Sequence, residues 1–376
     1  MKYLSNATAK GRINTAGCRL AVFFLACLCF FAACPLNATS SDSRLMPYVT
    51  GTKLYSFNPD AEQADSITDY SFFNMADGFT QSGTAASKKK GFILAWNQKK
   101  QKLCHITGKK IASSVDLKGS LAYAGSDYIL VQNSSFADNK GFSFKLYSIK
   151  YTWNRTKIKL NSVWTGHADC FVSDFFFTKD GICIAGGTKD DTKHNVFYIT
   201  DKGIHKCFSM EKDSDFLRLI KAEASQKVFA FVSTRDKAER PPVIYSFNME
   251  DTPDQAAEIN LSGDSLFPSG FDCFFGYGFP DTTSAVPDTT SAAPEHVEGA
   301  NLILPACIDG IISFLCYDCS AGKIARIVPN ATGCLAALGS TDDGTYYIAR
   351  DPLIEGSFYG ISLFTGTECK KISKNF

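Results

Sequence analysis

The sequence predicts an all-β protein built from short antiparallel strands that recur at a regular interval. Segments of alternating apolar and polar residues fill the chain after residue 44, and turns rich in Gly, Asn and Asp separate them. Helical periodicity is nearly absent, which favours strands over helices. One strand pattern also returns along the whole chain, which indicates an internal structural repeat.

The recurring strand follows an apolar-Tyr-Ser-apolar pattern in three copies and a looser version of it in four others. Each copy precedes a polar turn and a second strand, which together predict a β-hairpin. The copies begin at residues 54, 93, 146, 196, 244, 313 and 362. A further hairpin before several copies gives four strands per repeat, and four short strands in about 45–55 residues are typical of β-propeller blades.

These observations predict a β-propeller of four-stranded blades over residues 44–376. Seven copies predict seven blades, and six or eight are the alternatives because residues 44–60 can instead complete a blade that begins at the C-terminus. The pattern resembles the broad superfamily of WD40-like, PQQ-like and YVTN-like repeats, without the motif of any one subfamily. A pair of β-sandwiches has the same strand alternation and is the alternative fold.

The first 33 residues have the pattern of an export signal. Lys2, Lys10, Arg12 and Arg19 give this segment four positive charges and no negative one, and the apolar run Leu20–Ala33 follows. With 14 residues, the run is shorter than the roughly 18–20 that a transmembrane helix needs. Residues 1–33 are therefore predicted to be a removed signal peptide.

The end of this signal, Phe31-Ala32-Ala33-Cys34, resembles the lipobox of bacterial lipoproteins. The resemblance implies that cleavage leaves Cys34 as the lipidated first residue and that the protein is held to a membrane there. Leu is the commonest residue at the position of Phe31, so the match is a relaxed one. The alternative is a plain secretory peptide cut near Ala33, with Cys34 an ordinary cysteine.

The polar residues 34–43 are predicted to form a flexible tether between the anchor and the propeller. Pro35 rather than Asp follows Cys34, so the inner-membrane retention signal of some lipoproteins is absent. The expected location is therefore the bacterial cell envelope, at the outer membrane. The mature chain has 35 Lys and Arg against 38 Asp and Glu, which makes nucleic acid an unexpected partner.

A direct duplication interrupts the regular spacing. The heptad that begins at Pro280 is repeated from Pro287 with one substitution, in a tract of Pro, Thr, Ser and Ala. Such a composition buries too little apolar surface to order itself. Residues 280–299 are therefore predicted to be a low-complexity insertion that projects from one blade.

Ten cysteines lie in the predicted propeller, at positions 104, 170, 183, 207, 273, 307, 316, 319, 334 and 369. An exported protein can pair them in up to five disulfides, but many lie in apolar strands, where a free cysteine acts as a small buried hydrophobe. The sequence leaves the pairing open. Cys316 and Cys319 have CxxC spacing without the helix start that activates a redox thiol, and no second ligand pair suggests zinc.

Candidate catalytic motifs are weak. Gly263–Leu266 spells the GDSL string of a hydrolase family, in which Ser265 would be the nucleophile, but His296 lacks the family's Asp three residues before it. His167 and Cys170 place a base near a nucleophile and are expected to be structural. No HExxH, GxSxG or phosphate-binding glycine loop is present. No catalytic, cofactor-binding or metal-binding residues are therefore predicted.

The sequence thus predicts an envelope-anchored propeller that binds another envelope protein or an extracellular ligand without catalysis. Propellers present loops on two faces of a rigid scaffold, which suits recognition. One alternative is a propeller enzyme of the hydrolase, lactonase or quinoprotein type, with acidic or histidine side chains converging on the channel. Another is a glycan- or solute-binding lipoprotein, with an aromatic-lined pocket at one mouth.

Overall fold

The structure is a computed structural model. It describes residues 46–50, 53–68, 92–97, 100–107, 110–117, 121–125, 127–137, 141–151, 158–212, 216–221, 227–234, 241–281, 301–350 and 359–373. The predicted signal peptide, the tether and Cys34 lie outside this part of the chain.

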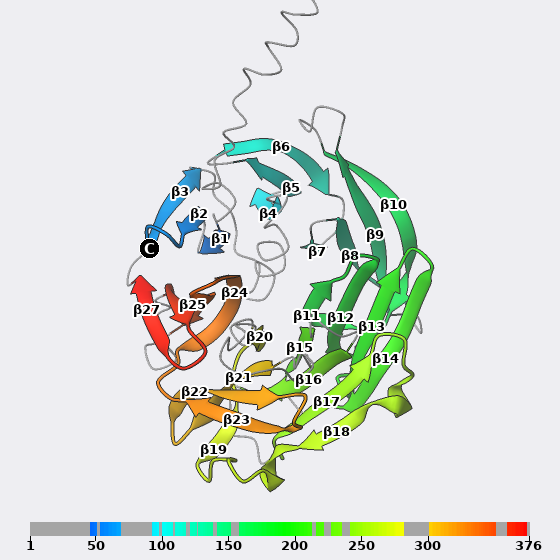
Figure 1. Ribbon diagram of the computed structural model, residues 1–376. Coiled ribbons are helices and arrows are strands. Elements are labelled where there is room, and N and C mark those ends of the chain that lie inside the picture. The colour runs from blue at the N-terminus through cyan, green and yellow to red at the C-terminus, as the bar shows by residue number, and fades with distance from the viewer. Residues whose placement is uncertain are drawn as a thin grey trace, which may run out of the picture. The chain divides into compact units, whose positions relative to one another are not determined.

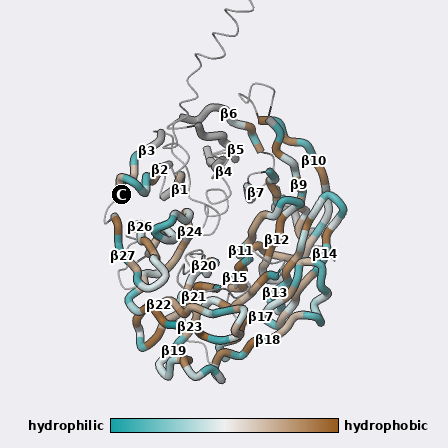
Figure 2. The backbone as a smooth tube through the Cα atoms, viewed as in Figure 1, coloured by the Kyte–Doolittle hydropathy of each residue, from teal (hydrophilic) through white to brown (hydrophobic). Residues whose placement is uncertain are grey.

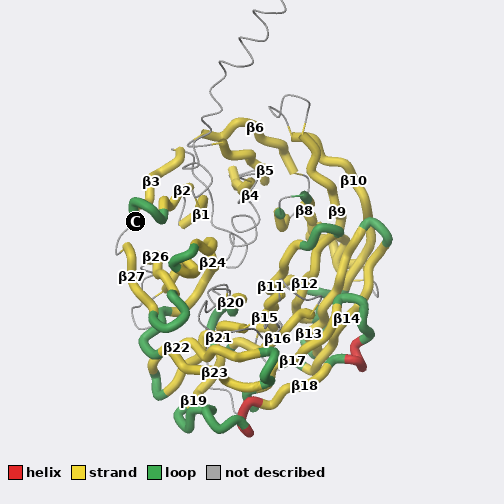
Figure 3. Tube along the Cα trace, viewed as in Figure 1, coloured by secondary structure: helices red, strands yellow, loops and turns green. Residues whose placement is uncertain are grey.

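The described residues form strands, joined by turns and two single-turn 3-10 helices, η3 (Pro253–Gln255) and η4 (Leu261–Gly263) (Figure 3). In this part of the chain, no helix has both the length and the apolar character needed to cross a membrane. The all-β prediction is therefore confirmed.

The described strands group into seven antiparallel sheets (Figure 1). The first three sheets contain β1 (Met46–Thr50), β2 (Lys53–Asn58) and β3 (Gln63–Thr68); β4 (Phe92–Asn97), β5 (Lys100–Thr107) and β6 (Lys110–Leu117); and β7 (Leu121–Ala124), β8 (Tyr128–Ala137), β9 (Gly141–Tyr151) and β10 (Ile158–Ala168). The fourth and fifth contain β11 (Phe171–Phe177), β12 (Gly181–Gly187), β13 (Lys193–Thr200) and β14 (Gly203–Glu211); and β15 (Phe216–Lys221), β16 (Lys227–Ser233), β17 (Val243–Asn248) and β18 (Ala257–Asn260). The sixth and seventh contain β19 (Phe271–Phe274), β20 (Phe279–Asp281), β21 (Asn301–Ile308), β22 (Ile311–Asp318) and β23 (Lys323–Val328); and β24 (Gly333–Thr341), β25 (Gly344–Arg350), β26 (Tyr359–Phe364) and β27 (Cys369–Ser373).

Within each sheet the strands pair in the order in which they follow along the chain, except that β19 and β20 both pair with β21. Such meandering sheets are propeller blades. Four sheets have the predicted four strands; the described residues supply three strands to each of the first two sheets and five to the sixth. The chain is therefore a β-propeller with seven sheets among its described residues.

The first sheet packs directly on the last one. Met46 and Phe57 share a buried cluster with Leu338 and Tyr346, and the rings of Phe57 and Tyr346 have centroids 5.2 Å apart. Residues 46–58 thus belong to a sheet of their own and do not complete the C-terminal blade, which already has four strands. This contact between the sheets farthest apart in sequence closes the propeller.

Six of the seven repeat copies lie on the strand next to the last in their sheet, from β2 in the first sheet to β26 in the seventh. The copy that begins at Ile93 is different, because it lies on β4, two strands before the last. The equivalent strand of that sheet is β5, whose Gln101-Lys102-Leu103-Cys104 lacks the aromatic-Ser signature. This mismatch explains the short spacing between the first two copies.

The hydrophobic core lies between successive sheets. Tyr123 and Phe144 of the third sheet, for example, share a buried cluster with Val172 and Phe175 of the fourth. Figure 2 shows hydrophobic residues along much of β12 and its neighbours, and six of the seven residues of β12 are buried. Burial of one such side chain contributes about 1.5–3 kcal/mol. Aromatic residues therefore hold one blade against the next.

The low-complexity tract begins inside a strand. Pro280 and Asp281, assigned to the insertion on composition, pair with β21 as part of β20. Asp281 is buried and forms an ion pair of 3.0 Å with Arg326. A proline fits there because β20 pairs on one side only among the described strands. Residues 282–299 of the predicted insertion lie outside the described residues.

Candidate ligand-binding face

Two cavities lie at the same end of the fourth sheet, where its strands begin and end. Phe171, the first residue of β11, pairs with Gly187 at the end of β12. Glu211, the last residue of β14, pairs with Lys193 at the start of β13. Because neighbouring strands are antiparallel, these strand ends all lie at the same end of the sheet. We call the surface at these strand ends the candidate ligand-binding face.

The first cavity, the phenylalanine pocket, has a volume of about 300 Å³. It lies where the third, fourth and fifth sheets meet. Its lining consists of Phe142, Phe171, Ser173, Gly187, Thr188, Lys189, Asp191, His194, Lys212 and Phe216. The pocket thus combines three aromatic rings with charged groups.

Two of the aromatic rings are unusually exposed. Phe171 is 59% exposed and Phe216 is 41% exposed, and they are two of the four exposed large apolar side chains among the described residues. Phe171 also packs edge-on against Phe142, with ring centroids 6.0 Å apart. A pair of exposed aromatic side chains at a cavity is typical of an interaction site, because a monomer gains nothing from exposing them to water.

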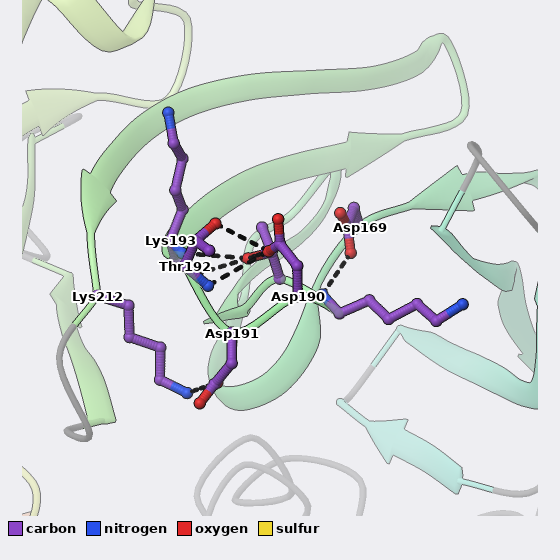
Figure 4. Close-up of polar contacts among 8 residues, drawn as sticks. Asp169, Asp190, Asp191, Thr192, Lys193 and Lys212 are labelled. Atoms are coloured by element: carbon purple, nitrogen blue, oxygen red, sulfur yellow. Dashed lines mark hydrogen bonds and ion pairs between the residues drawn. The ribbon is translucent and has the colours of Figure 1, made fainter.

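A hydrogen-bonded hairpin forms one rim of the pocket (Figure 4). Asp190 accepts hydrogen bonds from the Thr188 hydroxyl at 2.6 Å and from the Thr192 hydroxyl at 2.9 Å. These two hydroxyls hold the pKa of Asp190 below its usual value. The Thr188 amide also donates to the Lys193 carbonyl at 2.8 Å. The hydrogen bonds fix the rim in one conformation.

Two lysines and one carboxylate supply the charges of the pocket. Lys212 reaches from the end of β14 to form an ion pair with Asp191 on the hairpin (Figure 4). The Lys189 amide donates to the Asp169 carboxylate at 2.9 Å and so ties the hairpin to the β10–β11 turn. With Lys189, Lys212 and Asp191 the lining has a net positive charge, which favours a ligand with an anionic group.

A polar bridge joins β11 and β15 beneath the exposed rings. Asp174 accepts hydrogen bonds from the amides of Phe175 and Leu219, both at 2.8 Å. Arg218 donates to the Ser173 carbonyl at 2.7 Å and places its guanidinium carbon 3.9 Å from the Tyr277 ring centroid. The bridge therefore ties the first strands of two neighbouring sheets together at the pocket.

Burial sets the protonation behaviour of this bridge. It raises the pKa of Asp174 to about 6, although the Arg218 charge and the two amide hydrogen bonds lower it. The carboxylate is ionised at neutral pH, and its hydrogen-bonding capacity is directed at the backbone. We assign Asp174 a structural role in positioning β11 and β15.

The second cavity, the acidic cavity, has a volume of about 310 Å³ and lies between the fourth, fifth and sixth sheets. Its lining consists of Met210, Glu211, Val232, Thr234, Pro241, Pro242, Val243, Tyr245, Glu258, Phe271, Asp272, Cys273 and Phe274. Glu211 and Lys212 are consecutive, yet they line different cavities, because successive side chains of an extended chain point in opposite directions. The end of β14 thus separates a positive pocket from a negative one.

The CxxC cysteines do not form a reactive pair. Cys316 lies in the core cluster shared with the seventh sheet, whereas Cys319 packs on the cluster shared with the fifth. The two thiols therefore face opposite sides of the sixth sheet. Burial raises the pKa of each to about 12, so neither is a thiolate at neutral pH.

The structure places residues of the other weak motifs in buried or hydrogen-bonded positions. Burial raises the pKa of Cys170 well above its usual value, so it is not an activated nucleophile beside His167. Asp264 of the GDSL string accepts hydrogen bonds from the amides of Leu266 and Ile324. His296 lies outside the described residues. The described residues contain no group of three or more His, Cys, Asp or Glu side chains suited to a metal ion.

Sequence reasoning did not identify Phe171 and Phe216. Each is the first residue of a strand with alternating residues, and the alternation alone does not tell whether such a first residue is exposed or buried. The polar pair Ser173-Asp174 within an apolar strand is the one local signal that this end of the sheet is unusual.

No protein-family model and no curated protein matches the chain. Among solved structures, similar ones include a prolyl endopeptidase (TM-score 0.45, 12% identity, 94% of this chain and 53% of that one). A second is an acylaminoacyl peptidase from Pyrococcus horikoshii (TM-score 0.45, 10% identity, 88% of this chain and 52% of that one). A third is the Dos1 propeller (TM-score 0.44, 11% identity, 82% of this chain and 74% of that one). The chain spans about half the length of the two peptidases. At this level of similarity these structures say nothing about activity or ligand.

Proposed function

We propose that this protein is a bacterial envelope lipoprotein, anchored through Cys34 at the outer membrane, whose propeller binds another envelope protein without catalysing a reaction. The observation that carries the binding role is the exposure of Phe171 and Phe216 together at one pocket. Desolvation of exposed aromatic rings by a partner is a main source of binding energy at protein interfaces.

The surroundings of the rings support recognition. The Asp174 bridge below and the Asp190 hairpin beside them fix the pocket before a ligand arrives. A prepared site loses less conformational entropy on binding than a flexible one. Because Lys212 is paired with Asp191, Lys189 supplies the excess positive charge of the rim, which favours an acidic group on the partner.

A second candidate is a small-solute-binding lipoprotein. Its support is the cavity volume of about 300 Å³, at the lower end of the range for small-molecule sites. The enzyme alternative has weaker support, because the buried carboxylate nearest the pocket, Asp174, is engaged with backbone amides.

Site-specific photo-crosslinking in the native cells tests the binding role. A crosslinking residue at Phe171 is expected to form a protein adduct, whereas the same residue at Ile311, which is 50% exposed on another sheet, is expected to form none. Equal adducts at both positions, or none at Phe171, contradict the proposed protein-binding site. An adduct of small mass at Phe171 alone favours the solute-binding candidate.

The anchor has its own test. Cells fed a fatty-acid probe are expected to label the wild type and not the Cys34→Ser variant. Equal labelling of the two proteins contradicts lipidation at Cys34 and favours the alternative, a plain secretory signal peptide.

A further inference from the structure

One pair of cysteines lies directly opposite across two neighbouring strands. Cys273 of β19 and Cys307 of β21 are partners in the antiparallel register. Residues opposite each other in such a pair have Cα atoms about 4.5–5.5 Å apart. This range lies within the 4.4–6.8 Å that a disulfide requires.

The two thiols also face the same side of the sheet. Phe274 and Ala306, the neighbouring pair in the register, lie in the core cluster shared with the fifth sheet. Cys273 and Cys307 are the adjacent pair in the register and therefore point to the other side, although the strand is irregular at Asp272. There the Cys307 thiol donates a hydrogen bond to the Asp272 carboxylate at 3.4 Å, and oxidation replaces this hydrogen bond. Cys307 indeed packs on the cluster shared with the seventh sheet. Both residues are partly exposed, so an oxidant in solution can reach them.

Two other cysteine pairs are less suited to a disulfide, although the thiols of Cys183 and Cys207 lie within hydrogen-bonding reach of each other. Cys183 and Cys207 are fully buried on β12 and β14, which β13 separates. Strands two apart lie about 9–10 Å from each other, which is too far for a disulfide without backbone movement. Cys316 and Cys319 face opposite sides of the sixth sheet.

We propose that Cys273 and Cys307 form a disulfide in the exported protein. One thiolate attacks the sulfur of a disulfide-bearing co-reactant, either a small disulfide or a thiol oxidase, and releases one thiolate from it. The second cysteine then attacks the resulting mixed disulfide and releases the other. The two cysteines lose two electrons and two protons, and one co-reactant disulfide becomes two thiols.

The bond has a structural consequence for the candidate ligand-binding face. It ties the four-residue strand β19 to the eight-residue strand β21. Since β19 supplies Phe271 and Phe274 to the acidic cavity, the disulfide fixes one wall of that cavity. It also closes the chain segment that contains the duplicated tract, which restricts the unfolded chain and raises stability.

The proposal rests on the proposed export for its oxidising surroundings, but its chemistry is tested on purified protein. Reduced full-length mature protein is treated with oxidised glutathione, its free thiols are alkylated, and its peptides are mapped without reduction. Chymotrypsin is needed, because no Lys or Arg lies between residues 241 and 322. The expected product is a Cys273 peptide joined to a Cys307 peptide, with a melting temperature several degrees higher.

Matched variants separate the bond from a general effect of thiol loss. Cys273→Ser and Cys307→Ser are each expected to abolish the joined peptides and the rise in melting temperature, whereas Cys207→Ser retains both. Alkylation of both Cys273 and Cys307 in the oxidised wild type overturns the proposal, as does a bond from either one to a different cysteine. The peptide map of the wild type gives this answer even if a variant fails to fold.

Discussion

The contact between β11 and β15 and the contact that closes the propeller are built differently. Beneath the phenylalanine pocket, Asp174 and Arg218 join two sheets through hydrogen bonds to backbone groups. At the closure, Phe57 packs on Tyr346 in an apolar cluster, with an exposed ion pair between Glu62 and Lys370 outside it. Hydrogen bonds are directional and so fix the positions of the strands, whereas apolar contacts stabilise the fold without requiring one exact geometry. The comparison indicates that the first interface serves a site and the second serves stability.

The largest expected effect is at the closure. Phe57→Ala removes a fully buried ring and is expected to lower the free energy of unfolding by about 3–5 kcal/mol, as measured by urea unfolding. Phe171→Ala is the matched control on the exposed face, with an expected change of about 0.5 kcal/mol or less. The comparison fails if the two variants lose similar stability.

The Asp174 bridge makes the stability of the folded protein depend on pH. The folded protein holds the Asp174 proton with a pKa of about 6, against 3.8 in a model peptide. Binding of this proton therefore adds roughly 3 kcal/mol to the free energy of unfolding below pH 4, and this contribution is lost as the pH rises through 6. Unfolding measured between pH 4 and 7 is expected to show this fall, and Asp174→Asn is expected to lack it. An equal pH profile for the two proteins contradicts the assignment.

The smallest effect concerns the backbone beneath Phe171. A Cβ at Gly186 would lie 1.9 Å from the Phe171 carbonyl oxygen, so Gly186→Ala must displace the start of β11. We expect a loss of about 1–3 kcal/mol together with a weaker crosslink at the pocket. Gly263→Ala, which has no atoms within 4 Å of its added Cβ, is the control. Full crosslinking in Gly186→Ala indicates that the position of Phe171 does not matter.

The sequence predicts the architecture well and the site poorly, for a physical reason. Strand alternation and turn residues are local, so the blades can be recognised from the chain alone. The misplaced copy at Ile93 shows the limit, since its position in the sheet depends on which strands pair with it. The exposure of Phe171 and Phe216 depends on how neighbouring sheets meet. The opposition of Cys273 and Cys307 depends on strand register across a long insertion.

The binding role of the phenylalanine pocket is tested most directly by a variant that removes both rings. A photo-crosslinking residue at Thr188, on the pocket rim, is introduced into the wild type and into a protein carrying Phe171→Ala and Phe216→Ala. The account predicts that the double variant stays folded and loses the adduct. Its melting temperature is expected to fall by no more than a few degrees, because both rings are largely exposed and their loss removes only the described ring contacts with Phe142 and Arg218. An adduct that persists at full yield in the folded double variant would contradict the account.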